Sequence, residues 1–213
     1  MQTKQKPKQR DAEATRARIL AAAKKVFAKS GLGGARVDDI AERANANKRM
    51  IYHYFGSKED LFQAVLEEAY TDIREAEQKL ELDQTPPREA LEKLVRFTWE
   101  YYLKNPEFLT LVNSENLHRA KHLKKSEVIP VVSRRFVTMV KSLLDRGVAD
   151  GTFRPGIDAI QLNITIAAIG YYYLTNRYTG AIVYERDLMA KDALDERVEF
   201  NIDTIMRLVC VTP

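Results

Sequence analysis

The apolar residues of this chain recur at the three- to four-residue spacing of an α-helix along most of its 213 residues. This spacing gathers them on one face of a helix, where they can be buried together. Alternating runs of Val, Ile and Thr, which are typical of strands, are few. With 45% hydrophobic and 30% charged residues, the chain has the composition of a globular protein. We therefore predict an all-α fold with about nine helices.

Glycine, proline and capping residues divide this pattern into separate helices. Gly31 is expected to end the first helix in a left-handed conformation. Ser57, with Asp60 three residues later, indicates a capping box at the start of the fourth. The predicted helices are Glu13–Ser30, Val37–Ala44, Asn47–Phe55, Lys58–Leu82, Arg88–Lys104, Glu107–Lys121, Val128–Ala149, Ala159–Tyr178 and Leu194–Val209.

Charge is distributed unevenly along the chain. Residues 1–60 hold 14 Lys or Arg against 7 Asp or Glu, whereas the remaining residues hold 20 against 23. A basic head on a mildly acidic body indicates a polyanionic partner at one end. The alternative is a solvated basic tail that binds nothing.

Composition also limits the class of protein. The single cysteine, Cys210, excludes an internal disulfide and a cysteine metal cluster. No apolar run approaches the roughly 18 residues that span a bilayer, and no secretory apolar stretch follows the basic N-terminus. We expect a cytoplasmic protein without a membrane partner.

The stretch from Val37 to Phe55 has the pattern of a helix-turn-helix. Ile40, Ala41 and Ala44 give the first helix a small apolar face that a second helix can cross closely. Asn45 stands at the turn, and Asn tolerates the left-handed region better than most residues. Asn47 is a suitable N-cap for the second helix.

The second helix of this pattern carries side chains suited to DNA. Ile51 and Phe55 are four residues apart and anchor the helix inward, which leaves Lys48, Arg49, Tyr52 and His53 on the other faces. Arg and Lys can bind guanine or phosphate in the major groove, and Tyr and His can donate to phosphates or base edges. A solvated charged face on a small helical bundle is the alternative reading of the same residues.

Residues 18–66 resemble the DNA-binding domain of the tetracycline-repressor (TetR) family of bacterial regulators. The most distinctive match is Ile51-Tyr-His-Tyr-Phe-Gly-Ser-Lys-Glu-Asp-Leu61, an aromatic-rich helix followed by the start of the next. The sequence departs from the family at Asn45, where glycine is usual, and at Val37, where a capping threonine is usual and Asp38 could cap instead. The resemblance implies DNA contacts from Arg36, Lys48, Arg49, Met50, Tyr52, His53, Tyr54 and Lys58.

The resemblance also implies a domain organisation. Residues 1–12 would be a disordered basic tail, residues 13–60 the helix-turn-helix domain, and residues 61–213 a ligand-binding and dimerisation domain. The last two long helices would form a homodimer that reads a palindromic operator. The interface residues would be Ile160, Ile164, Ala167, Ala168 and Tyr171 on one helix and Val198, Ile202, Ile205, Met206 and Val209 on the other. An ordinary core within the chain is the alternative use of the same residues.

Members of this family usually enclose a small-molecule pocket among the middle helices. Aromatic side chains with a few polar groups suit such a pocket, although an ordinary core contains the same residue types. The candidate lining residues are Trp99, Tyr102, Phe108, Asn113, Asn116, Tyr172 and Asn176. We expect no cofactor other than this unidentified effector.

Glu115, His118 and His122 form a second candidate site. On a continuous helix their spacing would place a carboxylate and two imidazoles on one face, and these are ligand types that zinc prefers. The neighbouring lysines and Arg119 oppose a bound cation.

Taken together, the helix-turn-helix pattern and the family resemblance predict a DNA-binding repressor that a small molecule releases. Its alternatives are a metal-dependent helical enzyme that uses these three residues and a DNA-binding protein without an inducer; no catalytic motif supports the enzyme.

Overall fold

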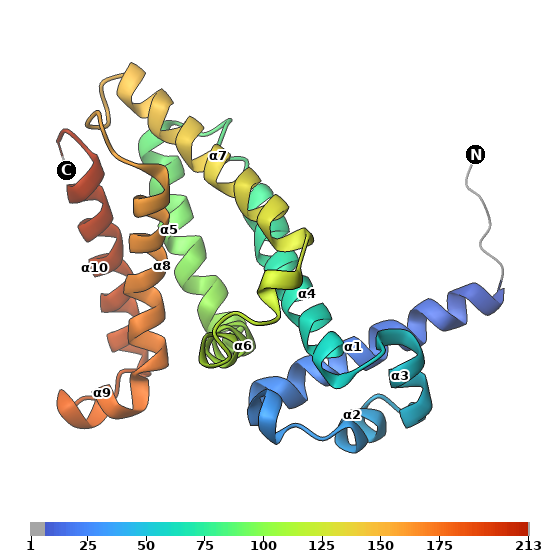
Figure 1. The fold of residues 1–213 in the computed structure, drawn as a ribbon. Coiled ribbons are helices and arrows are strands. Elements are labelled where there is room, and N and C mark those ends of the chain that lie inside the picture. The colour runs from blue at the N-terminus through green and yellow to red at the C-terminus, as the bar shows by residue number, and fades with distance from the viewer. Residues whose placement is uncertain (1–6, 213) are drawn as a thin grey trace. The chain divides into compact units, whose positions relative to one another are not determined.

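The computed structural model describes residues 7–212, with side chains from residue 11 onward. Within this range the chain forms ten α-helices and one short 3₁₀ helix, and no strand occurs apart from one isolated bridge. The predicted all-α fold is confirmed (Figure 1). The helices are α1 (Pro7–Gly34), α2 (Val37–Arg43), α3 (Lys48–Phe55), α4 (Lys58–Gln78), α5 (Pro87–Lys104), α6 (Pro106–Leu117), η1 (Leu123–Lys125), α7 (Val128–Ala149), α8 (Ala159–Thr175), α9 (Arg177–Val183) and α10 (Lys191–Val209).

The observed bounds differ from the predicted ones at several ends. Helix α1 begins at Pro7, inside the tail that we expected to be disordered, and residues 1–6 of that tail lie outside the described residues. Helices α4 and α6 end four residues earlier than predicted, at Gln78 and Leu117. The long apolar helix predicted to reach Tyr178 is divided at Asn176 into α8 and α9.

The chain divides into two compact units, and neither is continuous in sequence. The first comprises Met1–Tyr70 with Thr110–Ile129, and the second comprises Thr71–Leu109 with Pro130–Pro213. Helices α4, α6 and α7 each contribute residues to both units. The first unit therefore contains more of the chain than the helix-turn-helix domain that we predicted for residues 13–60.

Helices α1, α2 and α3 pack together at the centre of the first unit. Ile19, Ile40 and Ile51, one from each helix, are completely buried there. Phe27 of α1 meets Phe62 of α4 edge to face, with ring centroids 5.1 Å apart. The apolar faces that the sequence predicts for these helices thus converge on one core, which fixes the direction of α3.

Residues 110–129 complete this unit. The backbone N–H of Leu32 donates to Ser114 Oγ at 3.4 Å, and the His122 ring lies edge to face on Phe62 at 5.1 Å. Gly31, with φ of 65° and ψ of 175°, kinks α1 and presents Leu32, so the predicted positive φ is present, although α1 runs on to Gly34 instead of ending at Ser30. The end of α6 and the loop after it are therefore part of the same packed body as the helix-turn-helix.

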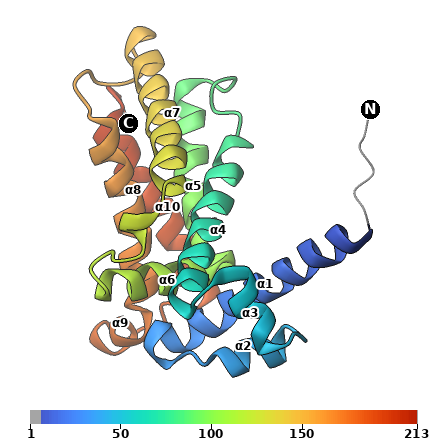
Figure 2. The ribbon, with the colours of Figure 1, turned by 45° about the vertical axis from the view of Figure 1, so that its right-hand side comes forward.

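In the second unit, α5 packs against both α8 and α10, which run side by side in the two ribbon views (Figures 1 and 2). Phe153 is buried against the backbone of Gly147, and its bridge to Cys210 ties the end of α10 to the loop after α7. Within the described residues, no helix has the length and apolar character required to cross a bilayer.

The outer surface of α8 and α10 differs from the predicted interface. Our prediction for α10 was wrong, because its five named residues are buried within the chain's own core; they are Val198, Ile202, Ile205, Met206 and Val209. The apolar side chains exposed on the opposite face of α10 are instead Phe200 and Leu208, which are 62% and 46% exposed. On α8, Ile160 and Ile164 are exposed as predicted.

Candidate nucleic-acid interface

A tight turn joins α2 to α3. Asn45 adopts the left-handed conformation with φ of 46°, which is the role that the sequence predicted for it. Asn47 caps α3, because its side-chain oxygen accepts a hydrogen bond from the backbone N–H of Arg49 at 2.8 Å. These two asparagines fix where α3 begins and at what angle it leaves α2.

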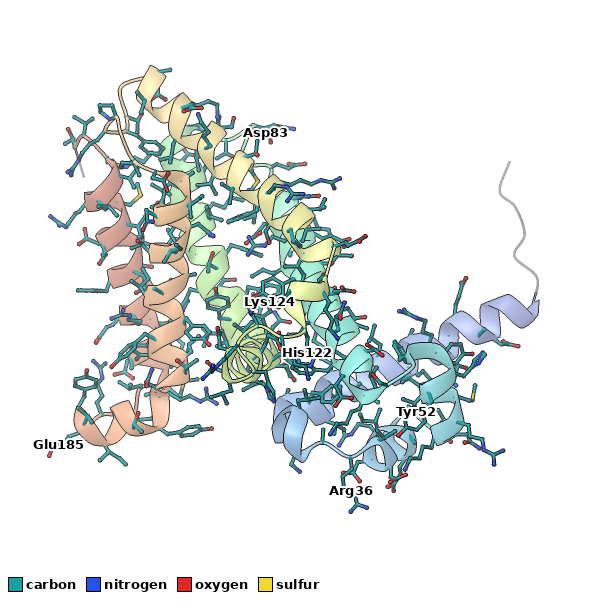
Figure 3. All side chains as sticks on the ribbon, viewed as in Figure 1. Arg36, Tyr52, Asp83, His122, Lys124 and Glu185 are labelled. Atoms are coloured by element: carbon teal, nitrogen blue, oxygen red, sulfur yellow. The ribbon has the colours of Figure 1, made fainter. Side chains whose placement is uncertain are left out.

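Helix α3 has one buried face and one exposed face. Ile51 and Phe55 are buried and anchor the helix. The guanidinium carbon of Arg16 lies 4.9 Å from the centroid of the Phe55 ring. Lys48, Arg49 and His53 are exposed, and Tyr52 is 45% exposed. Figure 3 shows Tyr52 on α3 and Arg36 in the segment before α2. The helix thus presents a row of cationic and hydrogen-bonding side chains to solvent.

Lys48 forms an ion pair with Asp38 of α2, with 2.9 Å between Nζ and Oδ1. The hydrogen bond from Lys48 lowers the pKa of the Asp38 carboxyl, and the same bond raises the pKa of the Lys48 ammonium. Asp38 does not cap α2, because no side chain caps that helix. Exposed ion pairs of this kind add little stability, so a phosphate can replace Asp38 as the partner of Lys48.

The other residues predicted to contact DNA differ in how far they are exposed to solvent. Arg36 is exposed, whereas Met50 and Tyr54 are half-buried. Lys58 is half-buried and its Nζ donates to the carbonyl of Ala35 at 3.1 Å. It therefore fastens the loop between α1 and α2 to the start of α4.

One arm of the capping box predicted at the start of α4 is present, whereas the Ser57 backbone N–H pairs with the Phe55 carbonyl and not with Asp60. Ser57 Oγ donates to Asp60 Oδ2 at 2.6 Å, and the backbone N–H of Asp60 donates to Ser57 Oγ at 3.0 Å. This arrangement ends α3 at Phe55 and begins α4 three residues later. Residues close to each end of α3 therefore determine where this helix begins and ends.

Glu115, His118 and His122 lie close together without forming a metal-binding arrangement. The Glu115 carboxylate accepts hydrogen bonds from His122 Nδ1 at 2.7 Å and from the backbone N–H groups of His122 and Leu123 at 2.7 and 2.9 Å. His118 Nδ1 instead pairs with the carbonyl of Ser114 at 2.7 Å. Over the described part of the chain, no group of three His, Cys, Asp or Glu side chains is arranged to hold a metal ion. The predicted metal site is replaced by a buried histidine–carboxylate pair.

The second unit contains a cavity of about 280 Å³ between α8, α9 and α10. Of the residues predicted to line an effector pocket, Tyr172 and Asn176 line this cavity. Trp99, Tyr102 and Phe108 do not; they are buried in the core, where Tyr102 and Phe108 stack at 5.9 Å. The cavity is lined by Tyr172, Tyr173, Asn176, Thr179, Gly180, Val183, Tyr184, Leu188 and Arg197.

Asn113 and Asn116 of the predicted pocket belong to the first unit. Asn113 is half-buried, and Asn116 is exposed with its amide donating to the Val112 carbonyl at 3.0 Å. Neither lines the cavity of the second unit. Several lining residues were not indicated by the sequence, Arg197 among them, because Arg197 lies among acidic residues that suggest an ordinary solvated helix face.

Comparison with known proteins agrees with the helix-turn-helix geometry. Residues 19–65 match the model for bacterial regulatory proteins of the tetR family, and residues 87–205 match the model for the tetracyclin repressor-like C-terminal domain. The chain belongs to the TetR family. The resemblance that residues 18–66 suggested is confirmed, and it extends to the second unit.

Several TetR-family proteins are similar over most of the chain. The HTH-type transcriptional repressor NicS of Pseudomonas putida is 41% identical over 196 residues, covering 92% of each protein. The HTH-type transcriptional repressor SCO4008 of Streptomyces coelicolor is 39% identical over 108 residues, which are 51% of this chain and 53% of that protein. These relatives are regulators, so the alternative of a metal-dependent enzyme is set aside and the chain is a DNA-binding transcriptional regulator.

Solved structures show the same fold. SCO4942 of Streptomyces coelicolor, a candidate transcriptional regulator, superposes with a TM-score of 0.70 at 25% identity, covering 92% of this chain and 98% of that one. FadR of Bacillus subtilis, solved with stearoyl-CoA, gives 0.65 at 17% identity, covering 90% and 97%. At this low identity the second likeness shows the fold and does not identify an effector for this chain.

Proposed function

We propose that this TetR-family regulator represses transcription by binding an operator through α3 and that a small molecule bound in the second unit releases it. The observation that carries the proposal is the geometry of α3. Its anchors are buried, while Lys48, Arg49 and Tyr52 lie on an exposed face that can enter a major groove. Arg36, Met50, His53, Tyr54 and Lys58 would bind or position the flanking backbone.

A homodimer would supply the second reading helix. One α3 contacts few base pairs, and helix-turn-helix dimers read half-sites about 34–36 Å apart. Ile160 and Ile164 of α8 and Phe200 and Leu208 of α10 are each between 46% and 62% exposed. Exposed apolar side chains gathered on two helices favour burial against another protein, and isologous contact with a second copy would bury them on both subunits.

The dimer predicts a specific effect of Ile164→Glu. A charge placed in an apolar interface is costly when it has no partner, so the variant should sediment as a monomer at concentrations where the wild type is dimeric. Sedimentation velocity measures this directly. The matched control is Lys104→Glu, an exposed position on α5, which should remain dimeric. A monomeric wild type, or a dimeric Ile164→Glu variant, would reject this interface.

The release mechanism rests on the helices that the two units share. Helices α4, α6 and α7 each contain residues of both units, so the chain passes within helices from the unit that carries α3 to the unit that carries the cavity. A ligand that binds one conformation of the second unit more tightly than another would increase the population of that conformation. The arrangement of the two reading helices in that conformation would then determine DNA affinity. Its effect on DNA affinity cannot exceed its difference in affinity for the two conformations.

Replacement of Lys48 and Arg49 by alanine tests operator binding. The double variant should lose about 100-fold in affinity for an operator obtained by selecting bound DNA, because a bidentate base contact and a phosphate contact would be lost. Fluorescence anisotropy at fixed salt measures the affinity for operator and for scrambled DNA. The difference between the two DNAs should nearly disappear.

The control removes two cations from the second unit. Lys104 and Lys141 are exposed and each pairs with an acid four residues away. Their double replacement by alanine lowers the net charge by the same amount and should leave operator affinity within about twofold, because distant exposed charges are screened at physiological salt. Equal losses in the two double variants would show that only net charge matters, and α3 would not be the reading helix.

A further inference from the structure

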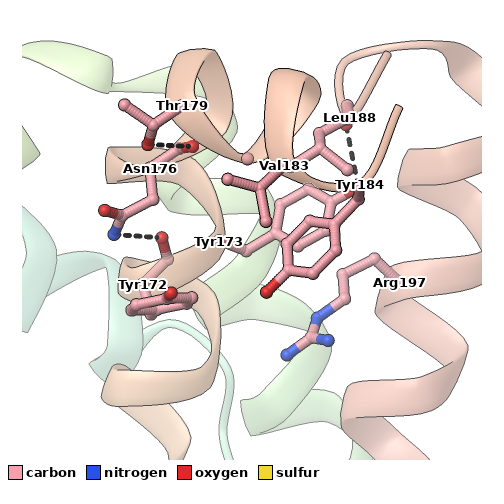
Figure 4. Close-up of a pocket in the computed structure, with 9 residues that line it drawn as sticks. Tyr172, Tyr173, Asn176, Thr179, Val183, Tyr184, Leu188 and Arg197 are labelled. Carbon is pink, nitrogen blue, oxygen red and sulfur yellow. Dashed lines mark hydrogen bonds between the residues drawn. The ribbon is translucent and has the colours of Figure 1, made fainter. Parts of the chain in front are cut away.

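The cavity of the second unit is enclosed on three sides by α8, α9 and α10 (Figure 4). Asn176 ends α8 and precedes α9, so the chain turns back here and opens a space beside α10. Gly180 allows α9 to approach the following loop, because a Cβ at this position would lie 2.7 Å from Leu188. The hollow is therefore built by the helix break that divides α8 from α9.

Arg197 is the one charged side chain that lines this cavity. It extends from α10 toward the tyrosines (Figure 4), between the rings of Tyr173 and Phe200, whose centroids are 5.2 and 5.3 Å from its guanidinium carbon. Its Nη2 donates to the carbonyl of Ile169 at 3.3 Å. Its Nε is buried and has no hydrogen-bond partner in the described part of the chain.

No carboxylate neutralises this arginine within the described residues. The neighbouring acids Glu196 and Asp192 both form ion pairs with Arg186 and not with Arg197. Burial lowers the pKa of the Arg197 guanidinium, and the coulombic effect of Tyr173 opposes that shift. A half-buried cation without a counter-charge is costly, and an anion that supplies the missing hydrogen bonds would remove that cost.

The remaining walls suit a flat ring. Tyr172, Tyr173 and Tyr184 contribute three aromatic side chains. The Tyr173 hydroxyl already donates to the carbonyl of Leu188 at 2.9 Å, and its ring meets Trp99 edge to face at 5.5 Å, so this wall is fixed in place. Tyr172 and Tyr184 are each 62% exposed. Their hydroxyls can donate to or accept from polar substituents on a ligand.

We propose that this cavity binds a small aromatic monocarboxylate, whose carboxylate pairs with Arg197 while its ring lies among the three tyrosines. The proposal rests on the proposed function, because this ligand would be the effector that changes DNA affinity. A single lining cation matches one negative charge rather than a phosphate dianion. The volume of about 280 Å³ lies just below the usual range for pockets of drug-sized ligands, which begins near roughly 300 Å³, and suits one ring.

The test uses benzoate, benzamide, acetate and phenyl phosphate as probes of the full-length protein by isothermal titration calorimetry. Benzoate should bind roughly tenfold or more tightly than benzamide, which lacks the charge, and than acetate, which lacks the ring. Phenyl phosphate should bind no more tightly than benzoate. Absence of benzoate binding at millimolar concentration, or equal binding of benzoate and benzamide, would overturn the proposal.

Substitution of Arg197 provides the second arm of the test. Arg197→Met keeps the apolar stem between Tyr173 and Phe200 but removes the cation, so benzoate affinity should fall roughly tenfold or more. Arg207→Met removes an exposed arginine of the same helix that pairs with Asp203 and should leave benzoate affinity unchanged. If Arg197→Met and the wild type bound benzoate with equal affinity, benzoate would not bind at Arg197 and the proposal would be wrong. The comparison of benzoate with benzamide on the wild type does not depend on how the variant folds.

Operator binding of the same samples separates this proposal from the proposed function. If the wild type binds an operator and benzoate binds but does not weaken DNA affinity, the aromatic carboxylate site stands and release by this ligand is rejected. If no DNA binds, the proposed function fails whatever the calorimetry shows. If DNA binds and benzoate does not, the operator function stands and this cavity is not an anion site.

Discussion

Replacement of Glu115 by alanine should lower the free energy of unfolding by about 3–5 kcal/mol, because each buried donor left without an acceptor costs roughly 1–3 kcal/mol. Glu115 is 1% exposed and its carboxylate accepts three hydrogen bonds. The substitution leaves two backbone N–H groups and one imidazole without acceptors, and a buried donor without an acceptor is costly. Urea unfolding followed by circular dichroism at fixed protein concentration measures the change.

Two variants sharpen this experiment. Glu115→Gln retains an oxygen that can accept from the backbone of the loop, so its loss should be smaller than that of the alanine variant. Glu42→Ala removes an exposed carboxylate from α2 of the same unit and should change stability by less than about 0.5 kcal/mol. If Glu115→Ala and Glu42→Ala had equal effects, the buried pair would not hold residues 110–129 to the first unit.

The same pair shows why the sequence misplaced this site. The spacing of Glu115, His118 and His122 suggests one helix face only if α6 continues to Lys121. In the structure α6 ends at Leu117, and the next residues include Arg119 and Ala120 with φ of 55° and 57°. This reversal brings His122 back onto Glu115. Two successive non-glycine residues in the left-handed region give no signal in a sequence.

The helix-turn-helix was predictable because local residues determine it. Asn45, Asn47 and Ser57 act on backbone groups within three residues of themselves, and each has the role that the sequence indicated. Helix propensity and capping depend on such short-range chemistry. The burial of Ile51 and Phe55 followed from their spacing on the same short helix.

The second unit was less predictable because its helices have more than one apolar face. Along α10, Val198 and Ile202 face the core while Phe200 and Leu208 face solvent, and spacing alone does not say which set is inside. The break at Asn176 falls among three polar residues, Thr175 to Arg177, but apolar and aromatic side chains lie on both sides of them, so the sequence was read as one helix. The environment of Arg197 depends on residues more than twenty positions away, such as Ile169 and Tyr173.

The stability of the second unit should decrease as pH rises from about 4.5 to about 7 because of Glu77. This residue is 2% exposed, and burial raises the pKa of its carboxyl from the ordinary 4.5 to about 7. The ion pair with Arg74, with 2.7 Å between Arg74 Nη1 and Glu77 Oε2, opposes this shift. Between these two values the folded chain holds a proton that the unfolded chain has released. Unfolding is then favoured by rising pH, and the stabilisation present below pH 4.5 is lost above pH 7. A shift of this size corresponds to roughly 3 kcal/mol.

Glu77→Gln isolates this contribution, because glutamine does not titrate. Urea unfolding at pH 5 and pH 8 should show a loss of stability between the two pH values that is smaller in Glu77→Gln than in the wild type by up to roughly 3 kcal/mol. The comparison is made against Glu75→Gln, which removes an exposed carboxyl from the same helix. If both variants changed the pH dependence equally, burial of Glu77 would not be its cause. A wild type that gained stability from pH 5 to pH 8, with Glu77→Gln gaining less, would reverse the sign and show that the ion pair with Arg74 outweighs desolvation.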